Sequence, residues 1–228
     1  MDLATAMKEL EAAGSERNRA IYRRHGAGDN QFGVSMSSLK ALQKQIKTDQ
    51  ELAEQLWETG NQDARNLATL IADPKQVTAA QLDAWLGSTD YYWLVDLFTR
   101  HLVSKSPLAR DRAEAWKDST RDNTAQAGWN LIAEIAMADR GLPDAYFEPF
   151  IDEIERDIHV RTNRTRFSMN SALIAIGLRS PSLRAKAEAA AQQIGRVEVD
   201  HGDTGCVTPD AIPYIEKSWE RKLSKAKK

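Results

Sequence analysis

Apolar residues recur along the chain at the spacing of α-helices. Leu39, Leu42 and Ile46 would line one face of a helix while Lys40 points outward, which is the pattern of a helix with one buried side. Strict alternation is confined to residues 196–200, a run too short to stand as a sheet. The pattern therefore predicts an all-α protein.

Capping and breaking residues set the ends of the predicted helices. Ser15, Asp49 and Thr78 precede helical runs as N-caps, and Gly60 and Gly195 follow such runs where helices end. We predict about a dozen helices, over residues 2–13, 15–24, 35–46, 49–59, 61–72, 78–87, 88–102, 107–117, 123–138, 143–158, 162–178, 180–194 and from 210 onward.

A glycine-rich stretch at residues 25–33 interrupts the helical pattern. It is not a phosphate loop of the nucleotide-binding type, because no strand precedes it and no Gly-Lys-Ser or Gly-Lys-Thr follows. Two interpretations stay open. The backbone N–H groups could hold a phosphate, aided by Arg23 and Arg24, or the stretch is a connection ordered by Phe32 packed in the core.

The helices follow one another with short connections and form antiparallel pairs at a loose spacing of about 30–45 residues. This spacing predicts an α-solenoid of HEAT-like helical repeats that covers residues 1–228 as a single domain. A compact helical bundle is the competing architecture. Residues 196–206 are expected to form a short extended segment and turn before the last helix.

Composition places the chain among ordinary globular proteins. Hydrophobic residues make up 42% and charged residues 28% of the sequence. The single cysteine, Cys206, excludes an internal disulfide framework and suits a reducing cytoplasm. Neither a signal peptide nor an apolar run of membrane-spanning length occurs, so we expect a cytoplasmic protein without a membrane span. We expect it to act as a monomer.

Charge is distributed unevenly, although the net value is only −2. Residues 1–48 carry eight Lys and Arg against five Asp and Glu, residues 49–160 ten against twenty-one, and residues 161–228 thirteen against seven. The net charge argues against a nucleic-acid binder, whereas basic ends around an acidic middle suit a surface that contacts phosphates. For the lysines of the C-terminal tail, a solvated end is the simpler interpretation.

The most informative stretch is residues 88–102. Tyr92 and Trp93 lie four and three residues before Asp96, so both rings can stand beside the carboxylate within about one helical turn. The ordinary alternative is that both rings are core aromatics and that Asp96 pairs with Arg100 one turn later.

A second candidate cluster lies on the predicted helix over residues 162–178. Arg161, Arg164 and Arg166, with Asn170, could clamp phosphates, because the planar guanidinium meets phosphate oxygens in pairs. The alternative is a solvated helix start that pairs with the acidic run at residues 152–157.

No metal or cofactor is expected. His201, Asp203 and Cys206 lie within six residues, but a structural zinc site normally needs four ligands at recognised spacings. A turn that connects the extended segment to the last helix explains these residues better. The remaining tryptophans, Trp57, Trp85, Trp116 and Trp219, fall at positions typical of core packing.

Several segments together resemble the bacterial DNA alkylation repair proteins of the AlkD type, and the resemblance covers nearly the whole chain. Each segment is weak alone, and their order and spacing make the resemblance specific. They are Phe-Gly-Val-Ser at 32–35, Leu-Trp-Glu-Thr-Gly-Asn at 56–61, Trp-Leu-Val-Asp at 93–96, Gly-Trp-Asn-Leu at 128–131, residues 163–177, and the run from Ile194 to Cys206, which resembles one branch of the family.

The resemblance implies a curved stack of HEAT-like repeats and an activity on DNA. Active members hydrolyse the N-glycosidic bond of N3- and N7-alkylated purines without flipping the base into a pocket. A Trp and an Asp four residues later, together with a second Trp, hold the deoxyribose, and an Arg assists at the backbone. A carboxylate and aromatic faces stabilise the cationic sugar that forms as the base departs.

Carried over residue by residue, Asp96 matches the family carboxylate. Tyr92 stands where the first Trp stands, and Trp93 is one position along, about 100° round the helix. Asn130 and Leu131 follow Trp129 where active members carry basic residues. The second family Trp is replaced by Ser171 or a neighbour.

Two hypotheses follow for the function. In the first, the protein binds duplex DNA, alkylated or branched, on a concave face and acts as an alkylpurine DNA glycosylase with Asp96 as its catalytic carboxylate. In the second, it is a non-catalytic binder of damaged or branched DNA, or a helical-repeat scaffold for another protein. The predicted DNA contacts are Tyr92, Trp93, Trp129, Arg161, Arg164, Arg166 and Asn170.

Overall fold

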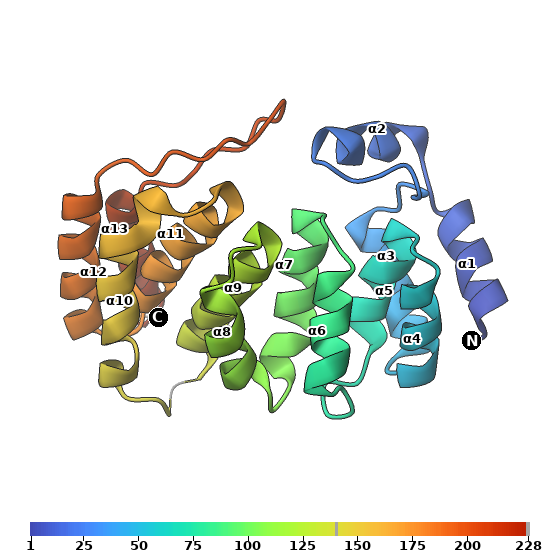
Figure 1. Ribbon diagram of the computed structural model, residues 1–228, viewed down its shortest axis with the longest axis horizontal. Helices are drawn as coiled ribbons and strands as arrows, with labels where there is room; N and C mark the ends of the chain where they lie inside the picture. The colour runs from blue at the N-terminus through green and yellow to red at the C-terminus, as the bar shows by residue number, and fades with distance from the viewer. Residues whose placement is uncertain (140, 227–228) are drawn as a thin grey trace. The chain divides into compact units, whose positions relative to one another are not determined.

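A computed structural model describes residues 1–139 and 141–226 of the chain. Thirteen α-helices and three short 3-10 helices make up its regular structure, and there is no strand within these residues. The all-α prediction is confirmed. The chain divides into two compact units, one formed by residues 1–109 with 201–205 and the other by residues 110–200 with the chain from Cys206 onward (Figure 1).

The first unit contains seven α-helices and one short 3-10 helix. They are α1 (Leu3–Ala12), α2 (Glu16–Arg24), α3 (Met36–Ile46), α4 (Gln50–Glu58), α5 (Gln62–Ile71), α6 (Ala79–Gly87), α7 (Tyr92–His101) and η1 (Val103–Lys105).

Helix α5 is the centre of the first unit. Nine of its ten residues are buried, and α3, α4 and α7 all pack against it. Trp57 of α4 stacks on Trp85 of α6 with ring centroids 4.3 Å apart and also meets Phe98 of α7. Because aromatic side chains remove much apolar surface from water, this cluster is a main source of stability for the unit.

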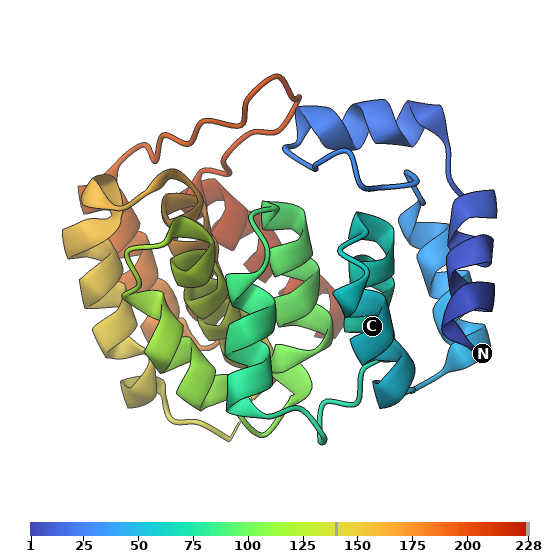
Figure 2. The same ribbon diagram turned by 45° about the vertical axis from the view of Figure 1, so that its right-hand side comes forward.

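Helix α2 is the exception in the first unit, because none of its residues is buried. It lies crosswise to α1 and leads into a loop that returns to α3 (Figure 2). Within that return, Gly33 has a φ of +79°, and a Cβ there would lie 2.5 Å from the Ser15 carbonyl oxygen. Only glycine fits this turn and this close approach.

The second unit contains the remaining helices. They are α8 (Ala109–Lys117), α9 (Asp122–Ala138), η2 (Asp144–Tyr146), α10 (Glu148–Asp157), η3 (Ile158–Val160), α11 (Asn163–Gly177), α12 (Pro181–Ile194) and α13 (Ala211–Ala226).

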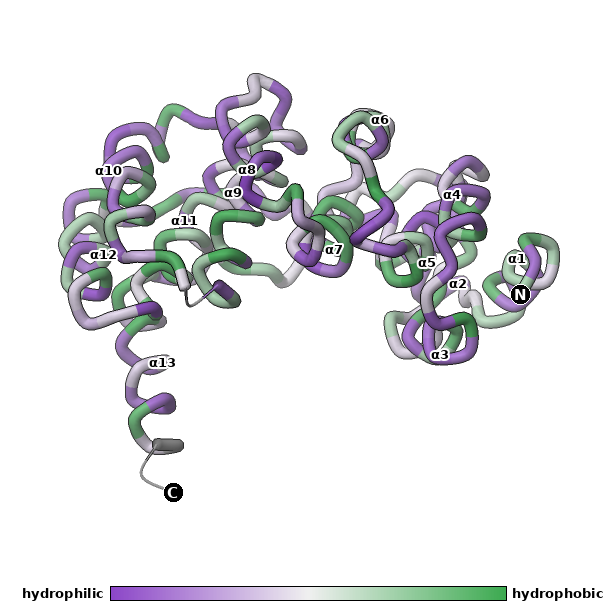
Figure 3. Tube along the Cα trace, turned by 90° about the horizontal axis from the view of Figure 1, so that it is seen from below, coloured by the Kyte–Doolittle hydropathy of each residue, from purple (hydrophilic) through white to green (hydrophobic). Residues whose placement is uncertain are grey.

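Helix α11 is the centre of the second unit. Ten of its fifteen residues are buried, and it packs along α9 and against α10, α12 and α13. Trp219 of α13 closes this side by donating its indole N–H to the Gly177 carbonyl at 2.9 Å. Each helix contains both hydrophilic and hydrophobic residues (Figure 3), as expected where a helix buries only one side.

The predicted helix boundaries differ from the structure in two places. The helix expected over residues 143–158 is divided, because η2 ends at Tyr146 and α10 begins after its N-cap, Phe147, with Pro149 in its first turn. Helix α7 begins at Tyr92 rather than Ser88, since Ser88 ends α6 as its C-cap. Residues 195–210 contain neither helix nor strand.

Candidate nucleic-acid interface

Helix α7 separates its buried and exposed residues as the sequence predicts. Leu94, Leu97 and Phe98 are buried in the first unit. On the other side Asp96 is half-buried, whereas the Trp93 side chain is 42% exposed. The helix therefore presents a carboxylate and an indole ring at the surface of the unit.

A long-range hydrogen bond fixes the third residue of this group, Tyr92. Its hydroxyl lies 2.5 Å from Nδ1 of His25, the residue that ends α2. The two rings are tilted at 48°, with centroids 6.3 Å apart. The contact joins the end of α2 to the start of α7, 67 residues later in the chain. Tyr92, Trp93 and Asp96, together with His25, are called the α7 site below.

Tyr91 forms the buried floor next to the α7 site. Its ring meets that of Tyr92 edge-on, with centroids 5.7 Å apart. Burial raises the pKa of Tyr91 far above its usual value, and the nearby Tyr92, Tyr22, Asp63 and Asp96 add to the effect. Tyr91 therefore keeps its proton, and its ring stays a neutral neighbour of the carboxylates.

The glycine-rich loop is held by a carboxylate that the sequence did not reveal. Asp63 of α5, which has no exposed surface, accepts hydrogen bonds from the backbone N–H groups of Phe32, Gly33 and Val34 at 2.6, 2.9 and 3.1 Å. Burial raises the pKa of Asp63, and the three backbone hydrogen bonds partly oppose this. Phe32 is half-buried rather than packed in the core, and the Asp63 carboxylate holds its backbone N–H.

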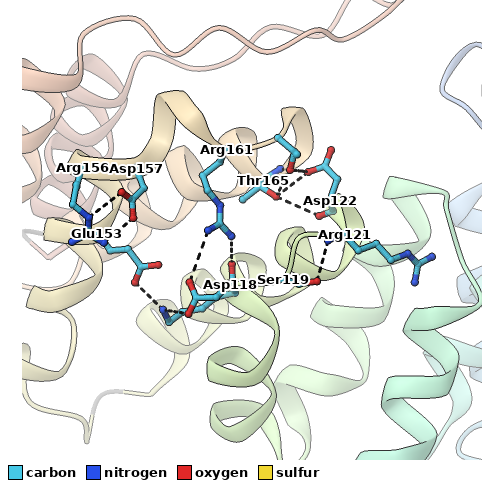
Figure 4. A network of polar contacts seen from close by, with 11 residues as sticks. Asp118, Ser119, Arg121, Asp122, Glu153, Arg156, Asp157, Arg161 and Thr165 are labelled. Atoms are coloured by element: carbon cyan, nitrogen blue, oxygen red, sulfur yellow. Dashed lines mark hydrogen bonds and ion pairs between the residues drawn. The ribbon is translucent and has the colours of Figure 1, made fainter.

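In the second unit, Arg161 belongs to an internal polar network (Figure 4). Its guanidinium donates to the Lys117 carbonyl at 2.6 Å and lies 3.9 Å from the Asp118 carboxylate. Lys117 in turn binds Asp118 at 2.7 Å and Glu153 at 2.8 Å. Burial alone would lower the pKa of Lys117, but these two carboxylates raise it, so the amine stays charged. The carboxylate next to Arg161 is thus Asp118 and not a residue of the acidic run at 152–157, whose Glu153 pairs with Lys117.

The start of α11 is capped by the first residue of α9. The Asp122 carboxylate accepts the backbone N–H groups of Arg164 and Thr165 at 3.0 and 2.8 Å, and the Thr162 hydroxyl at 2.6 Å. This cap fixes the helix turn that carries Arg164 and Arg166, both half-buried.

Two predicted DNA contacts lie in the core of the second unit. Trp129 has no exposed surface and packs edge-on against Phe150. Asn170 is 2% exposed and donates to the Pro209 carbonyl at 2.9 Å. Nearer the start of α11, Asn163 bonds both backbone groups of Asp200. The asparagines of α11 therefore hold the irregular segment at residues 195–210 at two points, Asp200 and Pro209.

Comparison with known proteins identifies the family. The model of the family described as DNA alkylation repair enzyme matches residues 6–215. The chain belongs to this family. The predicted resemblance to DNA alkylation repair proteins is confirmed, and the HEAT-like fold class is confirmed with it by a solved structure.

That solved structure is described as a new family of proteins related to the HEAT-like repeat DNA glycosylases, with affinity for branched DNA structures. It is similar to this chain with a TM-score of 0.89 and 33% identity, covering 97% of this chain and 95% of the other. Two uncharacterized proteins, Lmo0209 of Listeria monocytogenes and Lin0241 of Listeria innocua, are each 33% identical over 93% of this chain and 95% of their own length.

In this member of the DNA alkylation repair family, the sequence indicates a candidate site on α7 but not the distant side chains that hold α7, the glycine-rich loop and the start of α11. His25, Asp63 and Asp122 each act on a segment at least 29 residues away. The only local signals were the position of Asp63 in a first helical turn and the glycines of the loop that it holds. Among the described residues, no helix is long and apolar enough to cross a membrane.

Proposed function

We propose that the protein binds branched DNA through the α7 site. The observation that carries this proposal is the exposed Trp93 ring beside the half-buried Asp96, in a chain of this repair family. The related solved structure, described as having affinity for branched DNA structures, supports the same ligand class.

The chemistry of a branch point suits an exposed indole ring. Where duplex arms meet, base pairs end and base faces lack a neighbour, so an aromatic side chain can stack on them. Such stacking is worth about 1–3 kcal/mol per base. Trp93 supplies the ring, and the hydrogen bond between Tyr92 and His25 fixes the backbone of the same helical turn. The carboxylate of Asp96 then lies next to the sugar of the stacked nucleotide.

Basic residues of the second unit are proposed to contact the DNA backbone. Arg164 and Arg166 lie on the first turn of α11, which Asp122 holds by its cap. Arg161 supports them indirectly, because its guanidinium is engaged by Lys117 and Asp118. In this proposal Trp129 and Asn170 stabilise the helices, since both are buried.

Fluorescence anisotropy with a labelled four-way junction, and with a linear duplex of the same composition, tests the proposal. We expect tighter binding to the junction, and a loss of about 5- to 150-fold in junction affinity for Trp93→Ala, from the stacking range above. Tyr214→Ala is the matched control, because Tyr214 is an exposed aromatic residue (51%) of the second unit. Equal affinities for Trp93→Ala and the wild type would refute the role of the ring.

A second candidate function is hydrolysis of N3- and N7-alkylated purines from DNA. The half-buried Asp96 favours it, because a carboxylate beside the sugar stabilises the cationic character that develops as the base leaves and can orient water. An alkylated purine is itself cationic and needs no strong general acid.

Release of N7-methylguanine or N3-methyladenine from a methylated duplex tests this second function. Asp96→Asn should abolish release and spare duplex binding, whereas Asp90→Asn, at an exposed acid just before α7, should leave release unchanged. Release that persists in Asp96→Asn would remove Asp96 from the mechanism. We further propose that the protein acts in the cytoplasm, which suits its single cysteine, and that it is a monomer.

A further inference from the structure

Helix α2 carries a row of arginines whose side chains are exposed to solvent. Arg17, Ala20 and Arg24 are three and seven residues apart, so they lie on one face of the helix, and all three are exposed. Among the described residues, neither the Arg17 nor the Arg24 side chain has a hydrogen-bond or ion-pair partner. Arg23 lies at the edge of this face, with its Nε 2.8 Å from the Asp29 carboxylate.

The opposite side of α2 is anchored by polar contacts. Asn18 donates its amide to the Gly33 carbonyl and Tyr22 its hydroxyl to the Val34 carbonyl, each at 3.0 Å. Both carbonyls belong to the loop whose N–H groups Asp63 binds. A chain of hydrogen bonds thus runs from the core of the first unit to α2, and it holds the arginine face outward without burying it.

The arginine face has the dimensions of a short piece of DNA strand. Seven residues of α-helix span about 10 Å, and successive phosphates of one strand are separated by about 3.4 Å along the duplex axis. The face therefore spans about three phosphates. It ends at the α7 site, because His25 follows Arg24 directly and bonds Tyr92.

The chemistry of the face selects a polyanion. It consists of three guanidinium groups around a small alanine, with no large apolar side chain for a protein partner to bury. Guanidinium groups bind phosphate oxygens in pairs and keep their charge at every physiological pH. We propose that this face, formed by Arg17, Ala20 and Arg24 with Arg23 at its edge, binds the phosphodiester backbone of the DNA strand that enters the α7 site. This inference rests on the proposed binding of branched DNA.

The salt dependence of junction binding tests the proposal. Each phosphate contact contributes about 0.9 to the slope of log K against log salt concentration. Arg17→Gln with Arg24→Gln should therefore make the slope shallower by about 1.8. Arg17→Lys with Arg24→Lys keeps both charges and should retain most of the slope. If the two arginines only stabilised the fold, keeping the charges would not preserve the slope.

A charge-matched control lies at the far end of the same unit. Lys75, between α5 and α6, and Lys105, after α7, are both exposed. Lys105 comes after the C-terminal end of α7. The ten residues of this helix span about 15 Å, and Tyr92 lies at its other end. Lys75→Gln with Lys105→Gln removes two charges and should leave the slope unchanged.

The outcomes separate this inference from the proposed function. A wild-type slope in the Arg17→Gln and Arg24→Gln variant, with circular dichroism showing a folded protein, would overturn the inference while junction binding stands. An equal loss in the lysine control would also overturn it, because the effect would then reflect net charge alone. Absence of junction binding by the wild type would overturn the proposed function and this inference together.

Discussion

At the scale of single residues, Asp63 explains what the glycine-rich loop does. Three consecutive backbone N–H groups, from Phe32 to Val34, point at one place, which is the geometry of an anion site. The sequence raised the idea of a bound phosphate, and the anion is instead a carboxylate of the protein itself. Those N–H groups are consequently unavailable to DNA, and the phosphate contacts are assigned to arginine side chains.

Removal of the Asp63 carboxylate should destabilise the protein strongly. Asp63→Ala leaves three N–H groups without their acceptor, and a buried donor left unsatisfied costs about 1–3 kcal/mol. We expect the free energy of unfolding in urea to fall by roughly 2–5 kcal/mol, within the range of severe core substitutions. Asp29→Ala, at a side chain that is 88% exposed, should have little effect. Equal stability of the Asp63→Ala variant and the wild type would contradict the anchoring role.

The same carboxylate predicts a direction for the pH dependence of stability. The pKa of Asp63 is raised in the folded protein, mainly by burial, so the folded state holds its proton more tightly than the unfolded chain does. This contribution is fully present below the unfolded value of 3.8 and is lost as pH rises through the folded pKa. The unfolding free energy of the wild type minus that of Asp63→Asn should therefore decline from mild acid toward neutral pH. An increase of this difference toward neutral pH would contradict a raised pKa for Asp63 in the folded protein.

At the scale of helices, α11 depends on a cap from another helix. Burial would raise the pKa of Asp122, but hydrogen bonds from Thr162, Arg164 and Thr165 hold it below its usual value. The cap therefore stabilises the protein above the unfolded pKa and is lost as pH falls through the folded pKa. It also orients the first turn of α11, so stability and the position of Arg164 are linked.

Substitution of Asp122 should weaken both the fold and the arginine position. Loss of a helix cap costs about 0.5–2 kcal/mol, so Asp122→Ala should lower the free energy of unfolding by that amount at neutral pH. The difference from the wild type should shrink in acid, where the wild-type cap is protonated. Asp152→Ala, at an exposed residue of α10, serves as the comparison. A difference between Asp122→Ala and the wild type that grows in acid would contradict the assigned pKa direction.

At the scale of the whole molecule, the sequence predicted the features that depend on neighbouring residues, such as helix N-caps. The caps Ser15, Asp49 and Thr78 each accept the backbone N–H expected of them. Helix α7 has no side-chain cap, and there the predicted boundary failed. Family and fold class followed from segments spread along the chain, because their order carries information that no single segment holds.

The features that the sequence did not predict depend on contacts between distant segments of the chain. A helical period shows that Trp129 and Asn170 lie on particular faces, but it does not show which face meets another helix. Trp129 packs against Phe150 of α10 and Asn170 bonds the Pro209 carbonyl, and both residues are buried. The same limitation applies to the Asp63 anchor, whose partners precede it by 29 to 31 residues.

Photocrosslinking tests the central claim, that the α7 site contacts DNA, most directly. A four-way junction with 5-iodouracil at its branch point would be irradiated in complex with the wild-type protein, digested with trypsin, and analysed by mass spectrometry. We predict that the crosslink maps to the peptide of residues 76–100, at Trp93, and that Trp93→Ala removes it. A crosslink confined to another peptide, such as residues 48–65 with Trp57, would contradict the account.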